Sequence, residues 1–172
     1  MRALTLTATG GIECLKVQDV APPSAPGPGW ALVQVRAAAL NHLDLFVADG
    51  LPGVRPPFPF PVGADGAGTV SAVGAGVTSV RPGDDVLIDP GVSCGTCALC
   101  RAGNEPLCDR FGILGEHLPG TMAELVAVPA LNLAPKPPAM PWPQAAAFSL
   151  ATLTAWRMLT TRARLTAGES VL

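Results

Sequence analysis

Four cysteines between residues 94 and 108 form the segment of the sequence with the clearest chemistry. The segment reads C-G-T-C-A-L-C-R-A-G-N-E-P-L-C, so two residues separate Cys94 from Cys97 and Cys97 from Cys100, and seven residues separate Cys100 from Cys108. Four thiolates can surround one zinc ion tetrahedrally, with Zn–S distances of ~2.3 Å, and they leave no position for water. The spacing therefore predicts one structural zinc per chain, bound by all four cysteines.

Two other uses of these cysteines fit the spacing less well. The bacterial ferredoxin motif also begins with C-x-x-C-x-x-C, but its fourth cysteine comes after three residues and precedes proline. Disulfides are typical of short secreted chains, whereas residues 1–10 lack the continuous apolar segment of an export signal.

The composition excludes several classes of partner. The 172 residues include 11 basic and 13 acidic side chains, for a net charge of -2, without a basic cluster. We therefore expect no binding to nucleic acid or to membranes. Hydrophobic residues make up 49% of the chain and charged residues only 14%, which favours a surface that a partner covers. No segment reaches eighteen consecutive apolar residues, so no membrane span is expected and the predicted location is cytoplasmic.

The distribution of glycine, proline and apolar residues predicts a mainly β fold. Glycine and proline number 19 each, which favours short strands joined by tight turns. Apolar and polar residues alternate with the period of a half-buried strand in several segments. Strands are predicted at residues 2–7, 15–20, 31–40, 62–73, 85–89 and 122–128. Together they predict a barrel-like β domain that carries the zinc-binding loop.

Polar residues follow the predicted strand at 31–40, where loops commonly present functional groups. Asn41, His42 and Asp44 lie there among apolar neighbours. The alternative interpretation is structural, with a satisfied histidine and with Asp44 as the cap of the helical turn that follows. Asp65 interrupts an apolar strand, so its carboxylate needs a partner, and the candidates include His42 and His117.

A helical pattern replaces the strand pattern after Pro141. Pro143 suits a first helical turn, the apolar residues that follow recur at helical spacing, and Gly168 is a stop signal. Residues 170–172 (S-V-L) are interpreted as the beginning of a further strand.

These motifs resemble the medium-chain dehydrogenase/reductase superfamily, which contains zinc-containing alcohol dehydrogenases and quinone oxidoreductases. The resemblance rests on the C-x-x-C-x-x-C-x7-C lobe after a G-x-G-x-V strand and a P-G-D turn, on A-A-x-x-N-x-x-D, and on the alanine-rich helix. It implies a GroES-like catalytic, substrate-binding domain at residues 1–140, a partly open β-barrel with its zinc lobe at 94–108. Residues 141–172 would then be an interdomain helix and the start of a missing Rossmann domain.

The resemblance also implies an NAD(P)-dependent oxidoreductase. The isolated chain is expected to be an inactive catalytic-domain fragment, because it contains no dinucleotide-binding fingerprint. The alcohol-dehydrogenase branch holds a catalytic zinc with ligands at the positions of Asn41, Ala64 and Leu150, and it places a proton-relaying hydroxyl at Leu43. None of these positions offers the required side chain here. The sequence therefore looks more like the branch that reduces quinones or activated C=C and carbonyl groups by hydride transfer without catalytic zinc.

Roles for individual residues follow from the same resemblance. Asn41 would lie beside the nicotinamide ribose or the substrate, His42 would face the cofactor pyrophosphate, and Thr154 would contact the cofactor. The candidate catalytic residues are Asn41, Asp44 and Asp65, of which Asp44 braces the loop. Expected partners are a small-molecule substrate, the missing Rossmann domain and a second copy of the chain in a homo-oligomer.

Two alternative functions stay open from the sequence. One is a zinc-dependent alcohol dehydrogenase with unusual ligands drawn from His42, Asp65, Glu116 and His117. The other is a non-enzymatic GroES-like domain that binds a partner through its apolar helix face.

Elemental analysis provides a first test. We expect one zinc per chain in freshly purified protein and none in a variant that lacks all four cysteines, because the variant has no ligand left for the structural zinc. A second equivalent of metal that persists in the variant would instead support the alternative site around His42 and Asp65.

Overall fold

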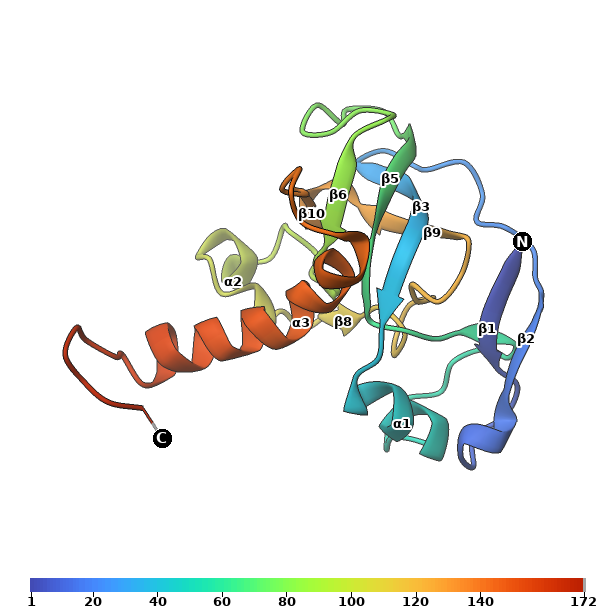
Figure 1. Ribbon diagram of the computed structural model, residues 1–172, viewed down its shortest axis with the longest axis horizontal. Helices are drawn as coiled ribbons and strands as arrows, with labels where there is room; N and C mark the ends of the chain where they lie inside the picture. Colours follow the sequence, from blue (N-terminus) through green and yellow to red (C-terminus); the bar gives the residue numbers. More distant parts are fainter. Residues whose placement is uncertain (172) are drawn as a thin grey trace.

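Three open antiparallel β-sheets dominate the computed structural model, which describes residues 1–171 (Figure 1). A five-stranded sheet has the order β10-β6-β5-β3-β9 and contains β3 (Trp30–Ala39), β5 (Asp65–Val73), β6 (Asp85–Ile88), β9 (Leu125–Pro129) and β10 (Leu133–Pro135). A three-stranded sheet has the order β2-β1-β4 and contains β1 (Arg2–Leu6), β2 (Leu15–Asp19) and β4 (Phe60–Pro61). In the third, β7 (Gly91–Val92) pairs with β8 (Gly112–Ile113). The predicted mainly β, partly open architecture is confirmed.

Helical segments connect and flank these sheets. The α-helices are α1 (His42–Asp49), α2 (Ala98–Arg101) and α3 (Trp142–Arg157). Shorter turns of 3-10 helix cover Ile12–Cys14, Glu105–Leu107 and Ala130–Asn132, and a π-helical turn covers Met158–Arg162. Within residues 1–171 no helix combines the length and the apolar character needed to cross a membrane.

The end of α3 differs from the prediction. We expected helix up to Gly168, but the α-helix ends at Arg157 and passes into the π-helical turn. The hydroxyl of Thr160 donates to the carbonyl oxygen of Trp156 at 2.7 Å, a side-chain bond that competes with regular helical hydrogen bonding. Ser170 and Val171 are not in a strand, and Leu172 lies outside the described residues.

The alternation predicted from the sequence places one face of the main sheet in the core. Buried side chains from β3, β5, β6 and β9 form it, among them Val33, Val70, Val86, Ile88 and Val126. A second core under β1 and α1 contains Leu6, Val47, Phe60 and Val62. The two cores hold the strands that present the polar residues discussed below.

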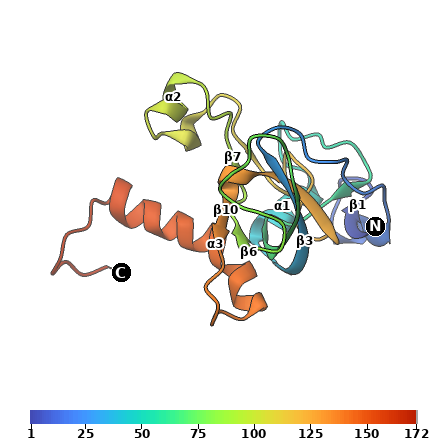
Figure 2. The ribbon, with the colours of Figure 1, turned by 90° about the horizontal axis from the view of Figure 1, so that it is seen from above.

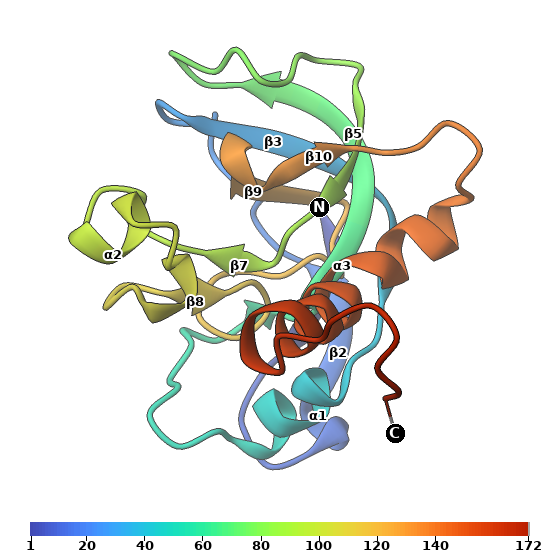
Figure 3. The ribbon, with the colours of Figure 1, turned by 90° about the vertical axis from the view of Figure 1, so that its left-hand side faces the viewer.

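Helix α3 packs against the outer side of the main sheet only through its first turns. Ala145 and Ala146 are fully buried against Ala67 of β5 and Leu87 of β6, because small side chains allow the helix to approach the strands closely. Figures 1 and 3 show the helix crossing these strands and then protruding from them. Its C-terminal half is therefore exposed.

The pairing of β3 with β5 brings together the residues that sequence analysis singled out. Ala39 at the end of β3 is opposite Asp65 at the beginning of β5. Asn41, two residues after Ala39, consequently lies beside Asp65. Further along the pair, Gly68 faces Val35 next to a register shift, and a side chain there would meet the backbone of Gln34.

A methyl group at Gly68 should therefore disturb this pairing. We expect Gly68→Ala to lower the free energy of unfolding by about 1–3 kcal/mol, the usual cost of overpacking, as measured by urea denaturation. Gly27→Ala is the matched control, because nothing lies within 4 Å of a Cβ at Gly27. Equal stability of the two variants would contradict the argument.

Candidate active site and metal centre

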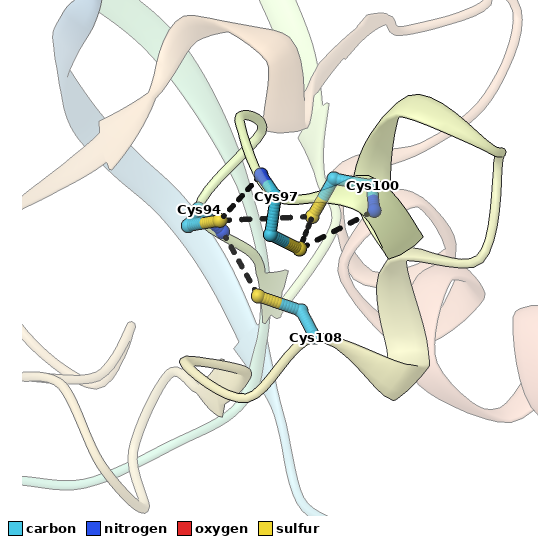
Figure 4. Close-up of side chains that lie close together, drawn as sticks. All are labelled: Cys94, Cys97, Cys100 and Cys108. Atoms are coloured by element: carbon cyan, nitrogen blue, oxygen red, sulfur yellow. Dashed lines mark hydrogen bonds between the residues drawn. The ribbon is translucent and has the colours of Figure 1, made fainter.

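The four cysteines converge in a lobe that projects from the sheets (Figures 2 and 4). Their sulfur atoms all lie within 4.8 Å of one another. The Sγ atoms of Cys94 and Cys100 are 3.8 Å apart, and those of Cys97 and Cys100 are 3.4 Å apart. A tetrahedron with Zn–S distances of ~2.3 Å has edges of roughly 3.8 Å, so the arrangement fits zinc.

The backbone of the lobe prepares these sulfurs to carry negative charge. The backbone N–H groups of Cys97 and Cys100 donate to the sulfurs of Cys94 and Cys97, at 3.3 and 3.4 Å. Hydrogen bonds from the backbone of Thr96, and then of Cys97, lower the pKa of the Cys94 thiol to about 5. At neutral pH this side chain is therefore a thiolate, the form that binds zinc.

A second cluster joins the end of β3, the start of β5 and helix α3. The Nδ2 atom of Asn41 donates to Oδ2 of Asp65 at 3.1 Å, and the backbone N–H of Leu150 donates to Oδ1 of Asp65 at 2.8 Å. Asp65 is 1% exposed, and this burial raises the pKa of its carboxyl group, against the lowering effect of both hydrogen bonds. The carboxylate therefore links the strand end to the helix and is closed to solvent.

The partners of Asp65 differ from those considered in the sequence. We considered His42 and His117, but the carboxylate uses the amide of Asn41 and the backbone of Leu150. His42 lies at the exposed start of α1, with its ring 6.4 Å from that of Phe46. His117 accepts a hydrogen bond from the backbone of Ile113 and lies beside Glu116.

The alternative metal site is not assembled in this structure. Within residues 1–171, the four cysteines are the only group of three or more His, Cys, Asp or Glu side chains whose ligand atoms converge. His42, Asp65, Glu116 and His117 thus do not form a ligand set.

Asp44 stabilises the loop that contains Asn41. Its Oδ2 accepts the backbone N–H of Asn41 at 2.8 Å in a capping box at the start of α1, and its carboxylate also bonds to the backbone of Gly63 and Ala64. Asp44 is 6% exposed, and this burial raises its pKa. The geometry makes it a brace between two loops.

A cavity of about 720 Å³ lies between the cysteine lobe and α3. Its apolar wall includes Phe111, Ile113, Leu150, Leu153 and Trp156, and polar groups come from Asp89, Thr154 and Arg157, among others. The predicted cofactor residue Thr154 thus faces the cavity, and Leu150 connects it to the Asp65 cluster. Asn41 and His42 are not in its wall.

Sequence analysis missed Asp89, which lines this cavity. One carboxylate oxygen accepts the backbone N–H of Gly91 at 2.9 Å, and desolvation by burial raises the pKa of the group. The available signal was its place at a strand end directly before the cysteine lobe.

Comparisons with known proteins agree with the fold. Residues 27–138 match the family described as the alcohol dehydrogenase GroES-like domain. The whole chain is 35% identical to the human synaptic vesicle membrane protein VAT-1 homolog and covers 37% of it. A solved NAD-dependent alcohol dehydrogenase is 48% identical with a TM-score of 0.94, over 98% of this chain and 49% of that chain. A cobalt- and zinc-bound thermostable alcohol dehydrogenase from Pyrobaculum aerophilum is 35% identical with a TM-score of 0.87, over 98% and 50%.

The fold and the cysteine site define the class of this protein as an open β domain with a four-cysteine lobe. The chain belongs to the alcohol dehydrogenase GroES-like domain family of the medium-chain dehydrogenase/reductase superfamily. It spans about half the length of the solved structures that it matches and 22–37% of the first curated relatives.

The role of Asp65 as an acceptor can be tested with two neutral variants. Asp65→Asn keeps an acceptor oxygen for the Leu150 N–H, and rotation of the Asn41 amide lets its oxygen accept from the new amide. Asp65→Ala leaves both donors without this acceptor. We expect Asp65→Ala to be less stable than Asp65→Asn by about 1–3 kcal/mol in urea denaturation at pH 7.

The pH dependence of the same variants gives a second readout. Since the folded state raises the pKa of Asp65, the folded chain binds this proton more tightly than the unfolded chain. The free energy of unfolding should therefore fall as pH rises above 3.8 through the folded pKa. This fall should be smaller in Asp65→Asn. If Asp65→Asn kept the pH profile of the unaltered protein, or if Asp65→Asn and Asp65→Ala were equally stable, the assignment of Asp65 as a buried acceptor would be wrong.

Proposed function

We propose that this chain is the substrate-side part of an NAD(P)-dependent reductase that transfers hydride to quinones or activated C=C or carbonyl groups without a catalytic zinc. The observation that carries the proposal is the cluster of Asn41, Asp65 and Leu150. By the family resemblance, Asn41, Ala64 and Leu150 stand at the positions that hold zinc in the alcohol-dehydrogenase branch. Here the same place is closed by hydrogen bonds.

The side chains at these positions do not fit a catalytic zinc. A methyl group at Ala64 and an isobutyl group at Leu150 offer no ligand atom, and an amide such as that of Asn41 is a weak ligand for zinc. Both carboxylate oxygens of Asp65 already accept hydrogen bonds. The proposed reaction therefore contains no metal-assisted step.

The nicotinamide, when bound, supplies the hydride, and the residues of this chain position the reactants. Asn41 is fixed by its Nδ2 bond to Asp65 and by the capping box at the start of α1, and the second lone pair of its Oδ1 can accept a hydrogen bond from a ribose hydroxyl or a substrate. Thr154 offers a hydroxyl at the cavity, whose apolar side chains exclude water from the acceptor. His42, exposed at the start of α1, is assigned to the cofactor pyrophosphate by the family resemblance.

Exposed apolar side chains on α3 support the division into residues 1–140 and 141–172. Phe148 is 43% exposed and Trp156 67% exposed, which is unusual for large apolar side chains on one helix. In this proposal a dinucleotide-binding domain covers them in the whole protein. The relatives contain about as much chain again as the part matched here.

Oxidation of alcohols is the second candidate function. It is favoured by the 48% identity to a protein described as an NAD-dependent alcohol dehydrogenase. It requires a proton acceptor and a Lewis acid near the alcohol, and neither Leu43 nor the Asp65 cluster provides them.

Steady-state assays of the protein expressed over its full natural reading frame separate the two candidates. We expect oxidation of NADH or NADPH in the presence of a quinone or a cyclic enone, unchanged by added Zn²⁺. We also expect Asn41→Ala to lower kcat/KM by about tenfold or more through lost positioning, with Asn104→Ala in the exposed lobe as the control. Turnover of alcohols that rises with added Zn²⁺, without enone or quinone reduction, would refute the proposal.

A further inference from the structure

Thr96, between the first two cysteines of the lobe, is held by two arginines. The Nε atom of Arg101 donates to the backbone oxygen of Thr96 at 2.8 Å. A guanidinium nitrogen of Arg110 donates to the hydroxyl oxygen of Thr96 at 3.4 Å. The same hydroxyl donates in turn to Sγ of Cys94 at 3.7 Å. A continuous chain of donors thus leads from the Arg110 guanidinium to a sulfur atom.

Arg110 also contacts a sulfur directly through its backbone. Its backbone N–H donates to Sγ of Cys108 at 3.4 Å. One residue therefore approaches the first and the last of the four cysteines, which are 14 positions apart in the chain.

No carboxylate competes for these arginines. The ion pairs found within residues 1–171 are Arg81 with Asp84 and His117 with Glu116, so neither Arg101 nor Arg110 pairs with an acidic side chain there. Glu105 and Asp109 lie nearby in the sequence without such a contact. The charge of Arg110 is accordingly directed to the sulfur atoms.

We propose that Arg110 is the outer-sphere counter-ion of the four-cysteine site and that it retards loss of the metal through Thr96. Four thiolates around a divalent ion carry a net charge of -2 by simple addition, in a lobe whose sulfurs are only partly shielded from water. A cation fixed by a hydrogen bond lowers the free energy of this anionic complex. This role is independent of the reaction proposed above.

The test is the rate of zinc release from the full-length protein to excess 4-(2-pyridylazo)resorcinol, followed by absorbance. We expect Arg110→Gln and Thr96→Val to release zinc about tenfold faster than the unaltered protein, in line with the effect of other outer-sphere substitutions. Arg110→Lys, which keeps the charge, should stay within about threefold. Arg55→Gln is the matched control, since it removes an exposed arginine outside the lobe.

The outcomes decide the proposal in each case. The proposal would be overturned if Arg110→Gln and Thr96→Val both released zinc at the same rate as Arg55→Gln. Release from Arg110→Lys as fast as from Arg110→Gln would also overturn it, because charge would then play no part. If Arg110→Gln does not fold, Thr96→Val and Arg110→Lys decide alone. Circular dichroism and one zinc per chain at the start confirm that each variant is intact.

Discussion

The hydrogen bonds of one buried carboxylate organise this protein around its candidate active site. Asp65 begins β5 opposite the end of β3, and from there it binds the side chain of Asn41 and the backbone of Leu150. Without it, the strand end and helix α3 would meet only through apolar contacts of small residues. Because an apolar contact has no fixed direction, the carboxylate is the element that defines how the helix and the loop after β3 are oriented.

The cysteine lobe is stabilised in a different way from the rest of the domain. It is joined to the rest of the chain through the two-residue strands β7 and β8, which are too short to hold the loop of residues 93–111 by themselves. Convergent thiolates, N–H donors and nearby arginines provide the cohesion that a hydrophobic core provides elsewhere. The lobe and the Asp65 cluster are thus stabilised by polar interactions, whereas the sheets between them are stabilised by apolar burial.

Much of this architecture was predictable from local patterns. Local residue patterns and turn signals identified β1, β2, β3, β5, β6 and β9, and cysteine spacing identified the lobe, because each signal depends on neighbouring residues. The partner of Asp65 was not predictable, because it involves Leu150, 85 positions away, and uses a backbone N–H that no residue type reveals. Asp89 was overlooked for the same reason: its burial beside a cavity depends on the placement of α3. The early end of α3 reflects a side-chain bond of Thr160 that helix propensity does not describe.

The exposure of Trp156 has an optical consequence. Trp30 and Trp142 are partly buried, whereas the indole of Trp156 is 67% exposed at the protruding end of α3. An indole in water emits at longer wavelength than one in an apolar environment. The contribution of Trp156 to the tryptophan fluorescence therefore depends on whether the end of the helix is exposed to solvent or covered, and it needs no added label.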